Sequence, residues 1–384
     1  MTAVFVGNGT AFGAWAANIP RVREAAGLQD GALGVVLLCI SLGAVVAMQV
    51  AGRYAGQIGT ARACWMAGLL LMVALPAPAF VPGYPALLLS GVALGLALGL
   101  LDVCMNAHAA WMERQAGLPI MSSFHAGWSV GQLLGAALAG GVAAWGLGVG
   151  WGLGLPAVLV GACGLAGLLL PAAPYAPAEP AHLAWPDRTI VVLGVLVACS
   201  FVIEGGVADW SSVYLRTVLG ASPAMASTSI AVFAGVMVLM RLVGDRLVAR
   251  LGPARVVAGG GAVAGVGLLI AVLAPGVVVG VCGFALVGVG VANIVPVLFS
   301  AAGARGAAGV AMVSTAGYAA GLASPPLIGL VSDGVGLRVG LGVLLIVACG
   351  LWSLGSRFDD YITSKRNFRR QPPAKTIDHQ QSLS

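Results

Sequence analysis

The arrangement of apolar residues constrains this chain more than any other feature. From the first residues to about residue 356, long apolar stretches follow one another, separated by short segments that contain charge, proline or glycine. A helix needs roughly 20 mostly apolar residues to cross a bilayer. Only 8% of the 384 residues are charged, whereas 59% are apolar, and so little charge cannot cover the surface of a water-soluble domain. We therefore expect an all-α membrane protein.

The breaks between the apolar stretches predict twelve transmembrane helices. Their expected ranges are 3–20, 31–51, 63–81, 86–112, 121–147, 154–171, 189–215, 223–244, 255–274, 276–300, 307–331 and 336–356. The first six are expected to form an N-terminal bundle at residues 1–171, and the last six a C-terminal bundle at residues 189–356. The proline-rich residues 172–188 are predicted to be the central cytoplasmic loop. The polar residues 357–384 are predicted to be a disordered cytoplasmic tail.

Positive charge predicts how the helices are oriented. With both termini placed in the cytoplasm, all but four of the 19 Lys and Arg residues fall on the cytoplasmic side. The exceptions are Arg21, Arg23, Arg216 and Arg338. This asymmetry is typical of a multi-pass protein of the bacterial inner membrane with both termini cytoplasmic. The net charge of +6 therefore needs no nucleic-acid partner to explain it.

The two halves of the chain repeat each other at an offset of about 190 residues. Ala51–Arg62 reads AGRYAGQIGTAR and Gly244–Arg255 reads GDRLVARLGPAR, while Trp15 corresponds to Trp210. Parallel repeats of this kind are typical of transporters whose substrate site lies between two halves, near the middle of the membrane. A channel or a membrane enzyme is not expected to show such a duplication.

The repeated segments resemble the loop motif G-x-L-A-D-R-x-G-R of the major facilitator transporters. The residues that carry this resemblance, and an expected gating role, are Gly52, Arg53, Arg241, Gly244, Asp245 and Arg246. The run from Asp102 to Gly131, together with Ala208–Ser211, resembles a bacterial branch near the fucose permeases. The first predicted helix lacks the carboxylate that fucose permeases carry there, so fucose itself is not inferred. The resemblance implies the major facilitator fold, with two pseudo-symmetric six-helix bundles that rock about a central site in a monomer.

Titratable residues inside the predicted helices are candidates for proton coupling. A carboxylate at membrane depth costs roughly 2.5–3.5 kcal/mol on insertion scales, so it is expected to have a function. Asp102 lies in the middle of the fourth helix, and Glu204 and Asp209 flank a pair of glycines in the seventh. His125, early in the fifth helix, has an ordinary pKa near neutrality and could relay protons. Structural hydrogen bonding is the alternative for Asp102 and His125, and Asp209 could instead pair with Arg216 or Arg21 as an external gate.

Aromatic and amide side chains are candidates for binding the solute, because rings pack on sugar C–H bonds and amides bond hydroxyl groups. The candidates are Trp15, Asn18, Asn106, Trp128, Trp210, Asn293 and Tyr318. A lone tryptophan in a membrane helix is also common in packing or at the membrane interface, which is the alternative. No Lys or Arg is predicted deep in a helix. Arg241, the nearest, is placed at the cytoplasmic end of the eighth, and this disfavours multiply charged anions.

Together these features predict a secondary active transporter for a small, neutral, hydroxylated solute such as a sugar or polyol, coupled to protons. Two alternatives are a proton-driven exporter of a drug or metabolite and a non-transporting membrane sensor. The sequence contains no catalytic constellation, nucleotide-binding motif or paired metal ligands, so no enzymatic activity, cofactor or metal is expected. The expected partners are the solute, protons and the lipid bilayer.

Overall fold

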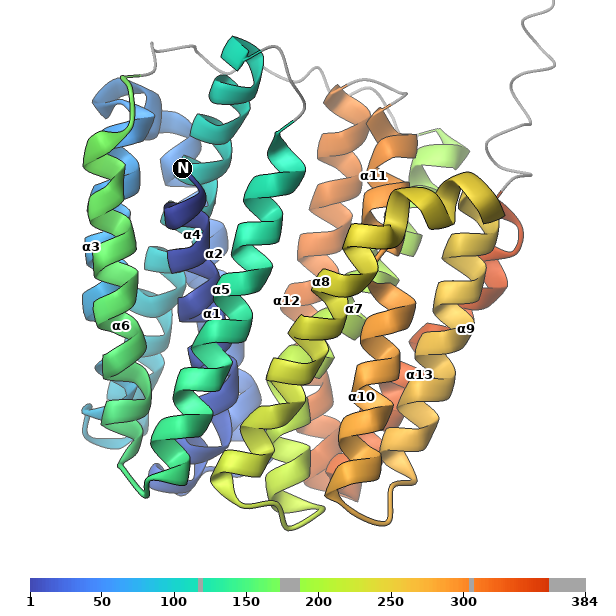
Figure 1. Ribbon diagram of the computed structural model, residues 1–384. Helices are drawn as coiled ribbons and strands as arrows, with labels where there is room; N and C mark the ends of the chain where they lie inside the picture. Colours follow the sequence, from blue (N-terminus) through green and yellow to red (C-terminus); the bar gives the residue numbers. More distant parts are fainter. Residues whose placement is uncertain (117–119, 173–186, 304–306, 359–384) are drawn as a thin grey trace, which may run out of the picture.

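The computed structural model describes residues 1–116, 120–172, 187–303 and 307–358, and the regular elements in these ranges are helices (Figure 1). The α-helices are α1 (Thr2–Ala25), α2 (Asp30–Ile58), α3 (Thr60–Ala74), α4 (Gly83–Ala116), α5 (Met121–Ala144), α6 (Val149–Leu165), α7 (Arg188–Thr217), α8 (Pro223–Leu251), α9 (Pro253–Val272), α10 (Val277–Val291), α11 (Ile294–Gly303), α12 (Ala307–Val335) and α13 (Leu337–Gly355). Two short 3₁₀ helices, Ala77–Ala79 and Ala166–Leu169, follow α3 and α6.

The helices make twelve crossings, as the sequence predicts. Ten stretches of the described chain are long and apolar enough to span a membrane, and one of them, Val277–Ala302, runs through both α10 and α11. These two helices are therefore one crossing with a break in it. The remaining crossings are α1 and α12, which run the length of the bundle but carry more polar residues (Figure 1). The predicted all-α, twelve-helix fold class is confirmed.

The helices gather into two halves that approach each other at one end. Helices α1–α6 pack mainly against one another, as do α7–α13. Between the halves, α5 packs on α8, α2 on α12, and α1 on α7 and α8. Figure 1 shows the halves together at the end away from the N terminus and spread apart at the end that carries it. We call these the closed end and the open end.

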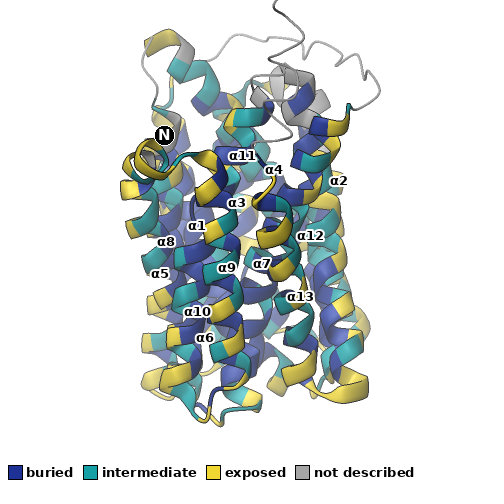
Figure 2. Cartoon of the chain, turned by 90° about the vertical axis from the view of Figure 1, so that its right-hand side faces the viewer, coloured by how far each residue is buried: buried dark blue, intermediate teal, exposed yellow. Residues whose placement is uncertain are grey.

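Exposed residues run along the outside of the bundle (Figure 2). Large apolar side chains such as Leu89, Leu239 and Ile346 are among the exposed ones. A water-soluble protein would bury side chains of this size, whereas lipid solvates them. The exposed surface therefore agrees with the membrane location predicted from composition.

Glycines allow α1 and α5 to pack with their backbones in contact. A Cβ atom at Gly13 would overlap the backbone of Gln132, and one at Gly135 would overlap the carbonyl oxygen of Thr10. Small residues at such positions let membrane helices approach closely, and the gain is van der Waals contact. The glycines of α5 therefore allow close packing of these two helices.

We expect Gly135→Ala to destabilise the protein by about 1–3 kcal/mol, because the added methyl group must push two helix backbones apart. The matched control is Gly141→Ala in the same helix, where a Cβ would meet nothing within 4 Å. It should leave stability unchanged or raise it slightly, since alanine is the better helix former. Thermal unfolding in detergent measures both, and equal unfolding midpoints for the two variants would contradict the packing argument.

Two helix boundaries differ from the predicted ones in ways that matter. The eighth helix was expected to end at residue 244, but α8 continues to Leu251. The next residue, Gly252, has a φ of 82° and terminates the helix. Its extension is polar because it leaves the apolar core, and so the loss of hydrophobicity near Arg246 did not mark the helix end. The tenth helix was expected to be continuous, but it breaks at Ala292–Asn293. Pro296 explains the break, since proline has no N–H to donate to the carbonyl four residues earlier.

Candidate functional site

Polar contacts between the halves gather at the closed end. The Arg216 guanidinium of α7 pairs with the Glu24 carboxylate of α1, with an Nε–Oε1 distance of 2.5 Å. The Ser212 hydroxyl donates to the Ala16 carbonyl at 2.9 Å. The Gly31 amide donates to the Asp333 carboxylate of α12 at 2.9 Å. These contacts hold α1 and α2 against α7 and α12, and they must separate if the closed end opens.

We expect Glu24→Gln to favour opening of the closed end by no more than about fivefold, because an exposed ion pair contributes about 0–1 kcal/mol. Hydrogen exchange at the adjoining ends of α1 and α7 measures the change. Arg23→Gln is the control, since the Arg23–Asp30 pair joins α1 to α2 within one half. If both variants raise exchange equally at the closed end, the Glu24–Arg216 pair has no specific gating role.

One face of α7 carries Phe201, Gly205, Asp209 and Ser212, which are spaced by three or four residues. Ser212 contacts Ala16 of the N-terminal half, whereas Phe201 packs against Tyr318 of α12. A Cβ atom at Gly205 would meet nothing within 4 Å, so the space beside it is open. The Asp209 carboxylate makes no hydrogen bond or ion pair with the residues that the structure describes. It therefore lies between this open space and the contacts of the closed end.

Asp102 lies on α4 and faces the C-terminal half. The Asn106 amide donates to the Asp102 carboxylate at 3.3 Å and to its backbone carbonyl at 2.9 Å. The Asp102 charge also acts on the Tyr318 hydroxyl of α12, in the other half. Asp102 and Asn106 are thus hydrogen-bonded neighbours on α4, and Tyr318 lies within range of the Asp102 charge.

Arg241 lies at the interface of the halves, three residues before the end of the membrane-spanning stretch Pro223–Gly244, as predicted. It lies ten residues before the last residue of α8 because the helix continues beyond that stretch. Its Nη1 donates to the Ser129 hydroxyl of α5 at 3.2 Å, and its Nε donates to the Ala292 carbonyl at 3.4 Å. Pro296 leaves that carbonyl without its helical donor, so the guanidinium replaces the missing N–H.

The charge of Arg241 acts on two of the predicted proton-coupling residues. One is Glu204 of α7, whose carboxylate accepts a 3.5 Å hydrogen bond from Ser200. The other is His125 of α5, which is exposed and lies edge-on to the ring of Phe5. In the described chain, neither forms an ion pair within 4.0 Å. Glu204, Arg241 and His125 therefore form one electrostatic group that spans both halves.

Aromatic pairs lie on each half. In the N-terminal half, Trp128 packs against Phe12 with ring centroids 5.5 Å apart, and its indole N–H donates to the Asn8 amide oxygen at 2.8 Å. In the C-terminal half, Phe201 packs against Tyr318 at 5.6 Å, and Tyr318 is 45% exposed. These pairs provide ring surface next to hydrogen-bonding groups.

Four residues of this arrangement were missed in the sequence: Asn8, Phe12, Ser129 and Phe201. Phe201 could have been identified as a candidate from the sequence, because it lies four residues before Gly205 and therefore on the same face of α7. Ser129 and Asn8 gave no comparable signal, since serine and asparagine are common in helix packing.

The other predicted solute-binding residues lie in the packed interior. Trp15 and Trp210 are buried. The Asn18 amide donates to the carbonyls of Ala14 and Gly152, inside the N-terminal half. The Asn293 amide donates to the Met240 carbonyl, inside the C-terminal half. In this conformation these residues do not join the group around Arg241.

The predicted gating motif is described in part. The surroundings of Gly52, Arg53 and Asp245 lie outside the described part of the chain. Arg246 is exposed near the open end of α8. A Cβ atom at Gly244 would overlap the Asn293 side chain, so this glycine lets α8 approach the break between α10 and α11.

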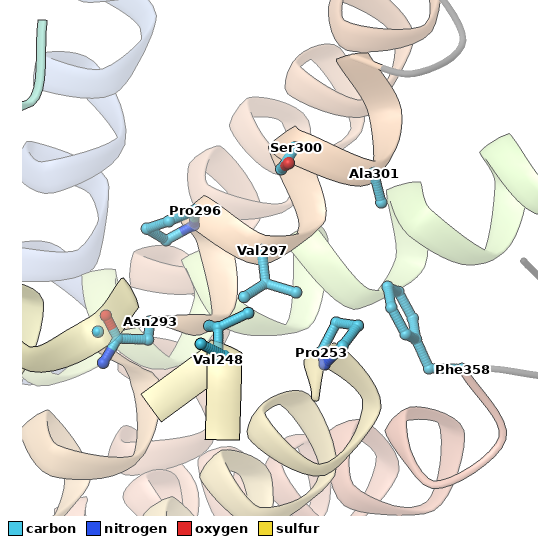
Figure 3. A pocket seen from close by; sticks show the side chains of 10 residues that line it. Val248, Pro253, Asn293, Pro296, Val297, Ser300, Ala301 and Phe358 are labelled. Carbon is cyan, nitrogen blue, oxygen red and sulfur yellow. The ribbon is translucent and has the colours of Figure 1, made fainter. Parts of the chain in front are cut away.

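A pocket of about 520 Å³ lies close to this break, in the C-terminal half (Figure 3). Its lining residues are Gly244, Val248, Ala249, Pro253, Asn293, Pro296, Val297, Ser300, Ala301 and Phe358. None of these carries a titratable side chain. The pocket lies between α8, α9 and α11, so it is separate from the carboxylates at the interface of the halves.

Comparison with known proteins identifies the type of molecule. Residues 1–325 match the model of the Major Facilitator Superfamily. An uncharacterized MFS-type transporter of Yersinia pestis is 34% identical over 351 residues, which cover 88% of this chain and 90% of the relative. Among solved structures, the nucleoside transporter NupG matches with a TM-score of 0.75 at 15% identity, covering 94% of this chain and 98% of that one. A D-xylose–proton symporter matches with a TM-score of 0.72 at 16% identity, covering 94% and 97%.

Proposed function

This chain belongs to the Major Facilitator Superfamily, and from that membership we propose that it is a secondary active transporter that moves a small hydroxylated solute by alternating access, coupled to protons. The transporter is a multi-pass membrane protein and not an enzyme. Import is the leading direction. Location in the bacterial inner membrane with cytoplasmic termini, and function as a monomer, are parts of the same proposal.

The observation that supports proton coupling is a surplus of carboxylates in membrane-spanning helices. Asp102, Glu204 and Asp209 all lie in such helices, and none forms an ion pair within the described chain. A charged carboxylate at this depth is costly, and a bound proton removes the charge. Because these residues lie on both halves, protonation can favour one arrangement of the halves over the other.

The support for a hydroxylated solute is the pairing of rings with hydrogen-bonding groups. Trp128 with Asn8, and Tyr318 near Asp102, offer ring surface beside amide, hydroxyl and carboxylate groups. Such sites suit solutes that present C–H bonds on one face and hydroxyl groups at the edge. The fold itself accommodates solutes of this kind, since its solved members include a nucleoside transporter and a D-xylose–proton symporter.

The charge of the solute is less restricted than the sequence suggested. Multiply charged anions were disfavoured because no Lys or Arg was predicted deep in a helix. The contact of Arg241 with Ser129 across the interface supports a solute with one negative charge as well as a neutral one.

Counterflow in liposomes tests the solute class without requiring a proton gradient. Purified protein is reconstituted with an unlabelled solute inside, and a labelled sugar, polyol or sugar derivative is added outside. We expect transient accumulation for at least one hydroxylated solute. If lipophilic cations exchange instead and every hydroxylated solute is silent, the protein is an exporter of the drug or metabolite class. Ligand binding without any exchange would indicate a sensor.

A further inference from the structure

We propose that the transported solute carries one carboxylate group, which binds to Arg241 and Ser129 between the two halves. This inference rests on the proposed transport function and names the chemistry of its solute. The class it identifies is the hydroxylated monocarboxylic acids, such as aldonic and uronic acids.

The guanidinium of Arg241 is held in a fixed orientation. Its Nε is bonded to the Ala292 carbonyl that Pro296 leaves free, and its Nη1 is bonded to Ser129. Its Nη2 makes no hydrogen bond within the described residues. The Ser129 hydroxyl in turn donates to the His125 carbonyl at 3.3 Å. A planar cation that is anchored on one side, with a free donor on the other, is suited to bind a carboxylate.

No carboxylate of the described chain lies within ion-pair distance of Arg241. The ion pairs in the described ranges are Arg23–Asp30 and Arg216–Glu24, both near the closed end. An unpaired guanidinium at membrane depth is as costly as an unpaired carboxylate, so a partner is expected at some stage of the cycle. The charge of Arg241 acts on the Glu204 carboxylate, but the two groups form no ion pair within 4.0 Å.

The surrounding charges favour a single carboxylate over a phosphate. The titratable groups on which the charge of Arg241 acts are Glu204 on α7 and His125 on α5. One cation can neutralise one negative charge. A dianion would leave a further negative charge near the Glu204 carboxyl group, and repulsion at low dielectric opposes that. The solute's hydroxyl groups would then meet the amides and rings already described.

The charge of the solute has a consequence for transport. One monoanion entering with one proton moves no net charge, so uptake does not respond to membrane potential. One neutral solute entering with one proton moves one positive charge, so uptake rises with an inside-negative potential. The two solute classes are therefore distinguishable by a potassium–valinomycin potential alone.

Matched pairs of probes test the proposal: gluconate against glucitol, galacturonate against galactose, and lactate against propane-1,2-diol. Binding is measured by stabilisation against thermal unfolding in detergent, and exchange by counterflow. For at least one pair, the acid should bind at least about tenfold more tightly than its partner in the wild type, which is the scale of a hydrogen bond to a charged group. Arg241→Gln should reduce this preference to near one, and Arg241→Lys should keep part of it because it keeps the charge.

Three results would overturn the proposal: stabilisation by no acid, tighter binding of the uncharged members, or an acid preference that Arg241→Gln leaves intact. The last result, with an Arg241→Gln variant that unfolds at the wild-type temperature, would indicate that Arg241 pairs with Glu204 and not with the solute. If uncharged members exchange and acids do not, this inference fails while the proposed function stands. If only lipophilic cations exchange, the proposed function itself fails.

Discussion

Replacing Asp102 with asparagine should abolish proton-driven accumulation of the solute while leaving exchange intact. A gradient of one pH unit can drive about tenfold accumulation when one proton accompanies one solute. Asparagine keeps the shape and the hydrogen-bonding capacity next to Asn106 but cannot take up or release a proton. The variant should therefore bring the solute only to equal concentrations on both sides, and counterflow should continue.

Asp187→Asn is the matched control for this substitution. Asp187 caps the start of α7, where its carboxylate accepts from the Ile190 amide at 3.0 Å. Asparagine is an equally good cap, so folding and accumulation should both stay at the wild-type level. Wild-type accumulation by the Asp102→Asn variant would show that Asp102 is not the coupling group and would leave Glu204 and Asp209 as the candidates. Loss of counterflow as well would assign Asp102 to solute binding.

Filling the space beside Gly205 should block transport without unfolding the protein. Gly205 lies on the α7 face that carries Ser212, which contacts Ala16 of the N-terminal half, and a Cβ atom at Gly205 meets nothing within 4 Å. The phenylalanine ring of a Gly205→Phe variant would enter the space between Phe201 and Asp209. We expect the rate of counterflow to fall by at least about tenfold. A destabilisation of the solute-bound state by about 1.4 kcal/mol is enough for that loss.

The control is Gly342→Phe on α13, where a Cβ atom also meets nothing within 4 Å. Helix α13 packs on α7, α9 and α12 and makes no comparable approach to the N-terminal half. This variant should unfold at the same temperature as Gly205→Phe and should retain counterflow. Full activity of Gly205→Phe would place the solute path away from this face of α7.

The crossings could be predicted from sequence because each depends on a local property. An apolar stretch of sufficient length becomes a helix in a membrane, since its backbone must bond internally. The end of α8 was predicted wrongly because it does not coincide with the end of the apolar stretch. Composition shows where the chain leaves the apolar core, but helical hydrogen bonding continues to Leu251. Pro296 was visible in the sequence, yet the break it makes depends on whether another donor can satisfy Ala292.

The central site could be predicted only by residue type. A carboxylate in an apolar helix is conspicuous, so Asp102 and Glu204 were found, and the charge of Asp102 acts on Tyr318 in the other half. Phe12 and Ser129 are ordinary residues for a membrane helix. Their position depends on which face α1 and α5 turn to the interface, and this is decided by glycine contacts such as Gly13 on Gln132. Tertiary packing of this kind has no periodic signal in one sequence.

The most direct test of the account measures protons and solute together. Liposomes that contain the protein and a pH-sensitive dye receive the hydroxylated solute identified by counterflow, with labelled solute followed in parallel. The account predicts internal acidification that begins with solute entry, at a fixed ratio of protons to solute, and that is absent in Asp102→Asn. Solute entry without a change in internal pH, or protons moving out as solute moves in, would contradict proton-coupled uptake.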